Sequence, residues 1–305
     1  MMAKKKSNQN SKVATRKPTV SIIGAGRLAT FLATALRDAG FTIREIVARD
    51  TPPSRRRARR LAAKVNAHSV TAKSAALDAN LLWFCVPDGE IRAAAWLLSD
   101  HLTARARMGQ RVISAFALHS SGALSSRELA PLGNAGVAVA SVHPLMTFVA
   151  GAHPSLAGVS FALEGDREAV QVARRIVRDL EGESFVLPAS RKAAYHAWAT
   201  MTSPLLLAFL VTLEEAARAA GLTRRDARRK NLPIIRQTLA NYERMGAAQS
   251  FSGPLVRGDA ATVAKHLASL KKHPGAREVY VALARAALRG LPVKNEDELK
   301  LLLEV

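Results

Sequence analysis

The sequence predicts an α/β fold in which a doubly wound, mostly parallel sheet is followed by a smaller all-α domain. Three observations lead to this prediction. A strand, a glycine turn and a helix follow one another over residues 20–39. Short apolar runs then alternate with helical patterns as far as residue 188, and helical patterns alone follow from residue 189. Alternating strands and helices are typical of a parallel sheet with helices on both faces.

The glycine turn follows the apolar run Val20–Ile23 and has the form Gly-x-Gly-x-x-Ala. The first glycine permits a tight turn, and the second has no Cβ that would keep a pyrophosphate away from the backbone. The amides and the dipole of the helix start then favour bound phosphates. An ordinary buried strand-to-helix turn is the alternative. In this context we predict dinucleotide binding by Gly24, Ala25, Gly26, Arg27 and Leu28.

Composition limits the class of protein. With 305 residues, 49% of them hydrophobic, the chain can bury a large core. Its single cysteine, Cys85, excludes an intramolecular disulfide and is consistent with a reducing cytoplasm. The apolar run 204–213 is too short for a membrane span, no signal peptide is visible, and spacings typical of zinc sites are absent. We therefore expect a cytoplasmic protein with no membrane partner and no metal site.

The formal net charge of +21 suggests anionic partners. Part of the charge lies in residues 1–17, a basic tail that we expect to be disordered, and part in the runs 55–60 and 224–230. A solvated surface explains such runs equally well. Aromatic residues make up 5% of the chain, too few for a platform that stacks single-stranded bases. We therefore do not expect nucleic acid as the main partner.

The residue after the second strand selects between the two nicotinamide dinucleotides. This strand, 43–48, is followed by Arg49 and Asp50. An arginine accommodates the 2′-phosphate of NADP, whereas an acid accepts hydrogen bonds from the ribose of NAD. Arg55 and Arg56 add positive charge to the loop, so we predict NADP(H) bound by Arg49. Asp50 supports NAD if the strand runs one residue longer.

A central strand is predicted where the chain is continuously apolar, over residues 81–86, after a helix over 54–66. Loops at the carboxyl ends of parallel strands line the ligand crevice. We therefore expect Val86, Pro87 and Asp88 near the cofactor. Asp88 is explained equally well as the N-cap of the following helix.

The predicted strands 111–117 and 137–142 each end in a histidine-bearing loop. Because imidazole titrates near neutrality, His119 or His143 could exchange a proton with a carbonyl or an alcohol. A hydrogen-bonded loop residue is the alternative for either histidine. Hydroxyl and amide groups that follow the first histidine could bind the nicotinamide amide or a substrate carboxylate. We predict that Ser120 contacts the cofactor. We predict that Ser121 and Gly122, together with His119 itself, contact the substrate.

The alternation of strands and helices ends with a strand over 185–187. We expect helices from Ser190 onward, the first of them capped by Ser190 and continuing to Ala220. Thr223 is the expected N-cap of the next helix. The predicted domains are a disordered basic tail (1–17), an NADP-binding sheet domain (18–188) and an all-α domain for substrate binding and dimerisation (189–305).

Several motifs together resemble a known family. They are Gly24-Ala25-Gly26-Arg27, Val86-Pro87-Asp88, residues 119–124, residues 141–145 and, more specific, Tyr195-His196-Ala197 and residues 253–259. They resemble a family of NADP-dependent oxidoreductases in which a Rossmann-like domain is fused to a helical domain of unknown function. That family is related to the 6-phosphogluconate dehydrogenase, ketopantoate reductase and pyrroline-carboxylate reductase group. The resemblance implies NADP(H), a small-molecule substrate between sheet and helices, and a homodimer formed through the helical domain.

The resemblance also suggests roles for single residues. The related enzymes use a lysine as general acid, here Lys192, four residues before His196 on one helix face. The stretch around His143 is similar to the histidine loop of prephenate and arogenate dehydrogenases, which makes His143 the first choice for proton transfer. Arg257 is a candidate clamp for a substrate carboxylate, with Asp259 beside it. The alternatives are a surface lysine, a packed histidine, a turn residue and an N-cap.

One position departs from the family pattern. Where the family commonly has Ala-Ser-Asn, this chain has Thr202-Ser203-Pro204. A substrate contact made there by asparagine is lost or passes to Ser203 or Thr200. A proline inside a helix is also expected to kink it.

These features predict an NADP(H)-dependent oxidoreductase that transfers hydride to or from a small carbonyl or imine substrate that carries a carboxylate. Ketopantoate is the specific substrate that the resemblance suggests. His143, or His196 with Lys192, would supply the proton, and Ser121 would orient the substrate. The departure at Pro204 leaves a non-catalytic NADP-binding sensor or scaffold as one alternative. The basic clusters leave a nucleic-acid-binding protein as another.

Overall fold

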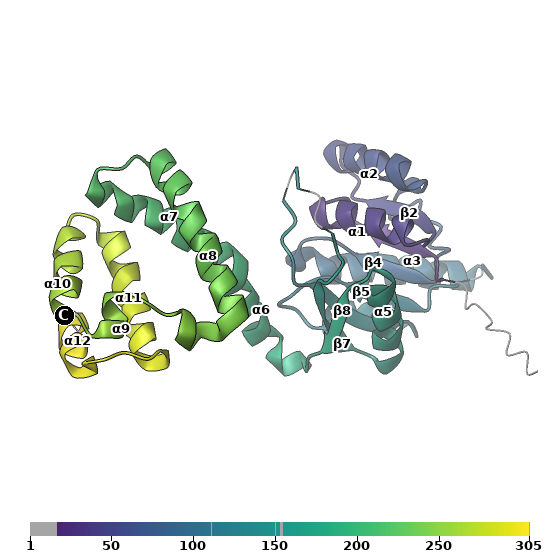
Figure 1. Cartoon of the computed structure of the whole chain (residues 1–305). Helices are drawn as coiled ribbons and strands as arrows, with labels where there is room; N and C mark the ends of the chain where they lie inside the picture. The colour runs from purple at the N-terminus through teal and green to yellow at the C-terminus, as the bar shows by residue number, and fades with distance from the viewer. Residues whose placement is uncertain (1–16, 111, 150, 153–154, 305) are drawn as a thin grey trace, which may run out of the picture. The chain divides into compact units, whose positions relative to one another are not determined.

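A computed structural model describes residues 17–110, 112–149, 151–152 and 155–304 (Figure 1). The chain divides into two compact units after Ala199. Residues 1–16 of the predicted disordered tail lie outside the described residues. Lys17, which was assigned to the same tail, is held in place, because its ammonium contacts the Asp179 carboxylate at 3.1 Å and the Ala39 carbonyl at 2.6 Å.

The first unit is built on an eight-stranded sheet of order β3-β2-β1-β4-β5-β6-β7-β8. The first six strands along the chain are parallel, β7 runs antiparallel to β6, and β8 runs parallel to β7. This confirms the predicted mostly parallel, doubly wound sheet. The strands are β1 (Val20–Ile23), β2 (Ile43–Ala48), β3 (His68–Thr71), β4 (Leu81–Phe84), β5 (Phe116–His119), β6 (Ala138–Pro144), β7 (Ser160–Gly165) and β8 (Glu183–Val186).

Helices cover both faces of this sheet. On one face Leu81 and Trp83 of β4 pack with the cluster that includes α1, α2 and α5, and on the other face Leu82 and Phe84 pack with α3 and α4. Successive strand residues point to opposite faces, so a strand covered on both sides is apolar at every position. These helices are α1 (Arg27–Asp38), α2 (Pro52–Val65), α3 (Ile91–Arg107), α4 (Ala130–Gly133) and α5 (Arg167–Asp179).

Two strand boundaries correct the sequence prediction, and both affect candidate site residues. Strand β5 begins at Phe116 rather than near residue 111, because Ser114 turns its hydroxyl back onto the Leu77 and Ala79 carbonyls, at 3.1 and 2.9 Å. His119 is consequently the last residue of a strand, not a loop residue. Strand β6 extends to Pro144 because β7 pairs with it, so His143 also lies within a strand.

The second unit is entirely helical among its described residues. Its core gathers residues such as Val263 and Leu299. Thr223 and Asp259 cap helices as expected, since each side chain accepts a hydrogen bond from a backbone amide three residues ahead. Pro233 lies inside α8 without disturbing its backbone angles, whereas Gly246 interrupts it. The helices are α7 (Leu206–Ala216), α8 (Arg224–Ser250), α9 (Pro254–Arg257), α10 (Ala260–Ser269), α11 (Pro274–Gly290) and α12 (Glu296–Leu303).

The predicted single helix from Ser190 to Ala220 is a chain of helical segments. It begins with a 3-10 turn, Ala189–Arg191, and continues as α6 (Lys192–Thr200), a π-helical turn (Met201–Leu205) and α7. Ser190 lies inside the first turn and does not cap the helix. Pro204 has no N–H for an α-helical bond, which explains the wide turn around it. Helix α6 belongs almost entirely to the first unit, so the division falls after the boundary expected near residue 189.

This helical run corrects one further expectation. Residues 189–220 are long and apolar enough to cross a membrane by length and composition, and they are mostly exposed. The sequence prediction measured the apolar run only from Pro204 to Leu213 and did not include the apolar residues that precede the proline in the same predicted helix. Its first two turns are tied to the sheet domain, because Lys192 bonds Ser121 and Tyr195 bonds His143.

Candidate functional site

The glycine turn between β1 and α1 uses its two glycines for different reasons. Gly24 has a φ of +109°, and a Cβ there would lie 2.5 Å from the Cys85 carbonyl oxygen, so the turn itself requires glycine. A Cβ on Gly26 would meet no atom within 4 Å. Gly26 is the N-cap of α1 and offers no side chain to the free amides of the first helical turn. The open space and the free amides together form a place where an anion can reach the backbone.

This turn borders a cavity of about 880 Å³ at the carboxyl ends of β1, β2 and β4. The strand order reverses between β1 and β4, and ligands of doubly wound sheets bind at this point. Of the predicted cofactor residues, those that line the cavity are Gly24, Ala25, Gly26, Arg27, Arg49, Val86 and Pro87. Leu28, Asp88 and Ser120 are not among the lining residues, and their contact with a cofactor stays a prediction.

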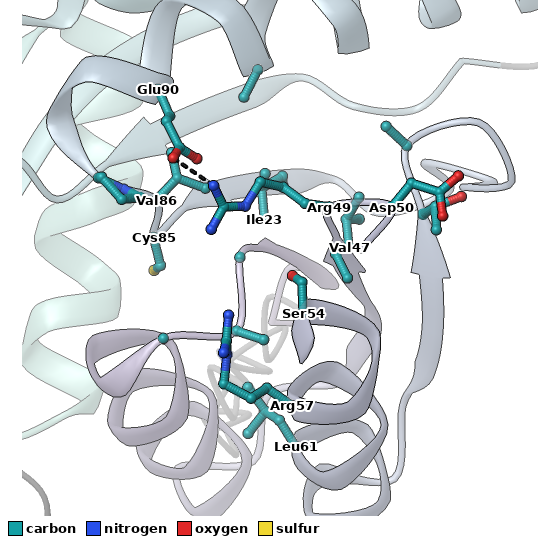
Figure 2. Close-up of a pocket in the computed structure, with 18 of the residues that line it drawn as sticks. Ile23, Val47, Arg49, Asp50, Ser54, Arg57, Leu61, Cys85, Val86 and Glu90 are labelled. Atoms are coloured by element: carbon teal, nitrogen blue, oxygen red, sulfur yellow. Dashed lines mark hydrogen bonds and ion pairs between the residues drawn. The ribbon is translucent and has the colours of Figure 1, made fainter. Parts of the chain in front are cut away.

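The cavity is basic. Arg49 at the end of β2 reaches across to Glu90 and forms an ion pair of 2.7 Å (Figure 2). Asp50 also lines the cavity, and its carboxylate forms an ion pair with Arg55. Arg57 rises from α2 toward the centre, beside Ser54 (Figure 2). The basic lining residues are Arg27, Arg49, Arg57, Arg60, Lys64 and Lys73.

Cys85 also lines the cavity, directly after β4. Burial raises the pKa of its thiol to about 12, although a hydrogen bond with Ser120 works in the opposite direction. The thiol is therefore protonated at physiological pH and is a poor nucleophile. We assign Cys85 a packing role in the cavity wall.

A buried ammonium group forms a second cluster at the same edge of the sheet. Lys192 of α6 is 2% exposed, and its Nζ donates hydrogen bonds to the Ser121 carbonyl at 2.9 Å and to the Ser141 hydroxyl. Burial lowers the pKa of Lys192 to about 8, and the carboxylates of Glu164 and Asp88 oppose this shift. Lys192 therefore carries its proton at neutral pH and can release it slightly above neutrality.

Asp88 belongs to this second cluster. Its Oδ2 accepts a hydrogen bond of 2.8 Å from the Ser121 hydroxyl, and that hydroxyl in turn accepts one from the Leu124 amide at 3.0 Å. The Ser121 hydroxyl is thus committed to the protein, and the residue contributes its carbonyl to Lys192. Because Val86 and Pro87 line the cavity and Asp88 follows them directly, one short loop connects the cavity to the cluster.

His143 and His196 meet at Gly122. A Cβ on Gly122 would lie 2.6 Å from the His196 ring and 2.9 Å from Nε2 of His143, so only glycine fits between them. The two imidazole rings stand edge to face, with centroids 6.1 Å apart. Nδ1 of His143 shares a hydrogen bond of 2.7 Å with the Tyr195 hydroxyl. Burial, reinforced by the positive charge of Lys192, lowers the pKa of His143 to about 4, so the ring is neutral at physiological pH.

His119 and Ser120 do not reach the expected positions. His119 is fully buried, and both ring nitrogens are occupied: Nε2 bonds the Ser125 carbonyl at 3.0 Å, and Nδ1 accepts from the Ser121 amide at 3.1 Å. Burial lowers its pKa to about 4. The Ser120 hydroxyl accepts a hydrogen bond of 2.9 Å from the Trp83 indole. Both side chains hold the β5 end in place, and we do not retain them as ligand contacts.

Three predicted substrate residues lie in the second unit. Ser203 is exposed in the π-helical turn, Arg257 is the last residue of α9, and Asp259 caps α10 by accepting a hydrogen bond of 2.9 Å from the Thr262 amide. Hydrogen bonds from the Thr262 side chain and then from its amide hold the pKa of Asp259 below its usual value. The N-cap alternative thus accounts for Asp259 fully. Substrate contacts by Ser203 and Arg257 stay predictions.

Sequence reasoning missed three residues of the site. Arg57 could have been found, because Ser54, Arg57, Leu61 and Lys64 share one helix face through their spacing and all line the cavity. Tyr195 was noted only as part of a motif. Ser141 is a polar residue inside an apolar strand, and its exposure is zero. A buried polar side chain requires a partner, which is the signal that could have drawn attention to it.

Comparisons with known proteins agree with this architecture. Residues 3–144 match the profile of a Rossmann-like domain, and residues 159–287 match that of a domain of unknown function, DUF2520. These matches confirm the resemblance that the sequence motifs suggested. A comparison with curated protein sequences gave no match.

Solved structures of similar fold cover nearly the whole chain. BF3122 from Bacteroides fragilis, which carries the provisional name NADP oxidoreductase, is 22% identical over 88% of this chain and 97% of its own, with a TM-score of 0.69. TM1727 from Thermotoga maritima is 24% identical over 88% and 96%, with a TM-score of 0.68. The NADP⁺-bound imine reductase from Myxococcus stipitatus is 15% identical over 93% and 100%, with a TM-score of 0.59. At these identities the likeness establishes the fold.

Substitution of the two glycines should affect stability to different extents. Gly24→Ala should lower the free energy of unfolding by about 2–4 kcal/mol, because alanine adopts a positive φ poorly and its Cβ would meet the Cys85 carbonyl. Gly26→Ala, the matched control, should change it by less than about 1 kcal/mol, because its backbone is extended and the space is open. Urea denaturation measures both. Equal losses in the two variants would contradict this account of the turn.

Proposed function

We propose that this chain, which joins a Rossmann-like domain to a DUF2520 domain, is an NADP(H)-dependent oxidoreductase acting on a small carbonyl or imine substrate. The observation that carries the proposal is the loop Val86-Pro87-Asp88. It connects a basic cavity beside a glycine turn to a cluster built around a buried lysine. A nucleotide site and a proton-carrying site at one sheet edge are the two parts that hydride transfer requires.

The cavity fits a dinucleotide phosphate. The open space at Gly26 and the first amides of α1 suit the pyrophosphate, and the basic lining suits a ligand with several negative charges. Arg49 and Arg57 both line the cavity, but the Arg49 guanidinium already forms an ion pair with Glu90. We therefore assign the 2′-phosphate to Arg57. Two proteins of similar fold carry NADP in their names or structures, which supports the same preference.

The reaction adds a hydride to the substrate carbon and a proton to its oxygen or nitrogen as the double bond is reduced. A bound nicotinamide would supply the hydride. Within this chain, Lys192 holds a proton that it can release near pH 8. Its bonds to Ser121 and Ser141 use two of the three ammonium protons and fix the direction of the third. This assignment moves the proton source from His143, the first choice of the sequence analysis, to Lys192.

The substrate that we propose carries a carboxylate. The buried positive charge of Lys192 attracts an anionic substrate, and Arg257 is the predicted clamp for its carboxylate. Ketopantoate is the first compound to test, on the basis of the family resemblance alone. A panel of other 2-oxo acids and cyclic imines follows from the same chemistry.

A second copy of this chain is the partner that we propose for the helical unit. Large apolar side chains are exposed on α7 and α8, which also contact each other; they include Leu206, Leu207, Val211, Ile234, Leu239 and Tyr242. Exposed apolar surface of this kind usually marks an interface. A membrane is less suitable as a partner because Lys192 and Tyr195 anchor the start of the helical run to the sheet domain.

Nucleotide binding tests the cofactor assignment. Wild-type protein should bind NADPH at least tenfold more tightly than NADH at moderate salt. Arg57→Ala should abolish this preference by weakening NADPH binding alone, because it removes the partner of the 2′-phosphate. Arg59→Ala is the matched control, since Arg59 lies on the same helix but does not line the cavity. Isothermal titration measures the Kd of each nucleotide for the wild type and the two variants. Arg49→Ala tests the sequence prediction that Arg49 binds the 2′-phosphate.

Gly26→Ala extends the same titration. The added Cβ would enter the space reserved for the pyrophosphate, so binding of both nucleotides should weaken about tenfold or more while stability is kept. If wild-type protein binds neither nucleotide, the glycine turn is a structural turn only and the proposed function is wrong. Tight binding without turnover of any carbonyl or imine would instead favour the non-catalytic sensor.

The pH dependence of turnover tests Lys192. If its ammonium supplies the proton, substrate reduction should be constant below about pH 7 and fall up to tenfold per unit above about pH 8, as the proton is lost. Lys192→Arg keeps the charge but does not release a proton in this range, so turnover should be low, by about 100-fold, and independent of pH. A wild-type profile without the decline would remove Lys192 as proton source. Steady-state kinetics with saturating NADPH give both profiles.

The oligomeric state tests whether a second copy of this chain is the partner of the helical unit. Light scattering after gel filtration should give twice the chain mass of 32.7 kDa for the wild type. Leu207→Glu with Ile234→Glu should produce monomers, because charges would replace apolar contacts in the interface. Leu301→Glu is the control, an equally exposed leucine on α12. Monomeric wild-type protein that co-sediments with lipid vesicles would favour the membrane instead.

A further inference from the structure

Tyr195 has no assigned role, yet it is the direct partner of His143. The residue is 7% exposed and lies one turn before Trp198 on α6. Its ring is held from two sides, with centroids 5.9 Å from Phe185 and 5.9 Å from Trp198. The hydroxyl lies 2.7 Å from Nδ1 of His143. A short hydrogen bond between two confined rings fixes their mutual orientation.

The proton in this hydrogen bond belongs to the phenol. Burial raises the pKa of Tyr195 to about 12, and His143 has a pKa near 4, so both groups are neutral at physiological pH. The charged or titratable groups that face His143 are Lys192 and His196 from α6 and His119 from β5, and a positive charge on any of them opposes protonation of the ring. A phenol is a better donor than acceptor, and a neutral imidazole nitrogen is a good acceptor. Tyr195 O–H therefore donates to Nδ1.

This donation fixes the tautomer of the imidazole. When Nδ1 accepts a hydrogen bond, the ring proton lies on Nε2. Nε2 is the atom that faces Gly122, where a Cβ would approach it to 2.9 Å. Because Gly122 has no side chain, no Cβ covers this side of the ring. The same loop, residues 120–122, follows β5 at the carboxyl edge of the sheet.

We propose that Tyr195 is a positioning residue that holds His143 in the Nε2–H tautomer, so that His143 donates a neutral hydrogen bond to the substrate oxygen or nitrogen. This inference rests on the proposed reductase function and refines it. His143 keeps its proton throughout the reaction: the hydride goes to the substrate carbon, the π electron pair moves onto the oxygen or nitrogen, and that atom takes its proton from Lys192. A neutral donor stabilises the developing negative charge without becoming a base afterwards.

Nitrogen NMR of the imidazole rings tests the tautomer directly and requires no substrate. In wild-type protein labelled with ¹⁵N-histidine, His143 should show a protonated Nε2 and an unprotonated Nδ1 that accepts a hydrogen bond. The spectrum of His143→Gln identifies its signals among the eight histidines. In Tyr195→Phe, which keeps the aromatic packing, His143 should become a mixture of both tautomers. A protonated Nδ1 in the wild type, or a spectrum unchanged in Tyr195→Phe, would overturn the proposal.

Two conservative variants of His143 test the neutral donor in turnover. The glutamine amide N–H lies about where Nε2–H stood, whereas the asparagine amide lies near Nδ1. His143→Gln should therefore retain turnover within about tenfold of the wild type, and His143→Asn should lose about 100-fold. Equal losses in both variants would mean that His143 acts as an acid or base and would contradict the proposal.

The outcomes separate the two levels of inference. Failure to bind either nucleotide removes the proposed reductase, whereas the NMR result then still decides which nitrogen of His143 carries the proton. If the protein binds nucleotide and turns over substrate but His143 carries its proton on Nδ1, the proposed reductase function stands and the proposed role of Tyr195 is wrong. In Tyr195→Phe the Kd for NADPH should equal that of the wild type, because Tyr195 does not line the cavity.

Discussion

The buried ammonium of Lys192 is the constraint around which the candidate site is arranged. An ammonium with 2% exposure has lost its hydration and must be compensated within the protein. The compensation comes from separate parts of the sheet: the Ser121 carbonyl after β5, the Ser141 hydroxyl within β6, and the more distant carboxylates of Asp88 and Glu164. Groups from four strands, β4 to β7, or from the loops that follow them, thus compensate one charge. Its burial also explains why the proton is labile near pH 8 rather than above pH 10.

The loop after β4 connects this charge to the nucleotide cavity. Val86 and Pro87 form part of the cavity wall, while Asp88 bonds the same serine whose carbonyl accepts from Lys192. A doubly wound sheet brings these groups together because the carboxyl ends of parallel strands share one edge. Gly24 makes the connection possible, since its backbone packs directly against the Cys85 carbonyl. Two sites built from loops distant in sequence thus share a short, rigid link.

The fold could be predicted from sequence because its signals are local. Leu81–Phe84 is apolar at every position, as a strand covered on both faces must be, and the glycine turn is a contiguous motif. The candidate site was harder to predict from the sequence because it depends on hydrogen bonds between strands. Nothing near His119 in the sequence indicates that both its nitrogens are occupied. Arg49 was chosen by its position after β2, and its ion pair with Glu90 depends on a loop 41 positions farther along the chain.

Electrostatic coupling between Lys192 and His143 determines which of the two groups carries a positive charge. Burial and, after it, the charge on Lys192 lower the pKa of His143, so the two groups cannot both be cationic at low energetic cost. If Lys192 holds the proton, His143 must be neutral, and a neutral imidazole can act only through its tautomer. The tautomer is set by Tyr195, which lies on the same helix as Lys192, three positions later, and faces the same strand. One helix therefore supplies both a charge that adds to the effect of burial on His143 and the hydroxyl that orients its remaining proton.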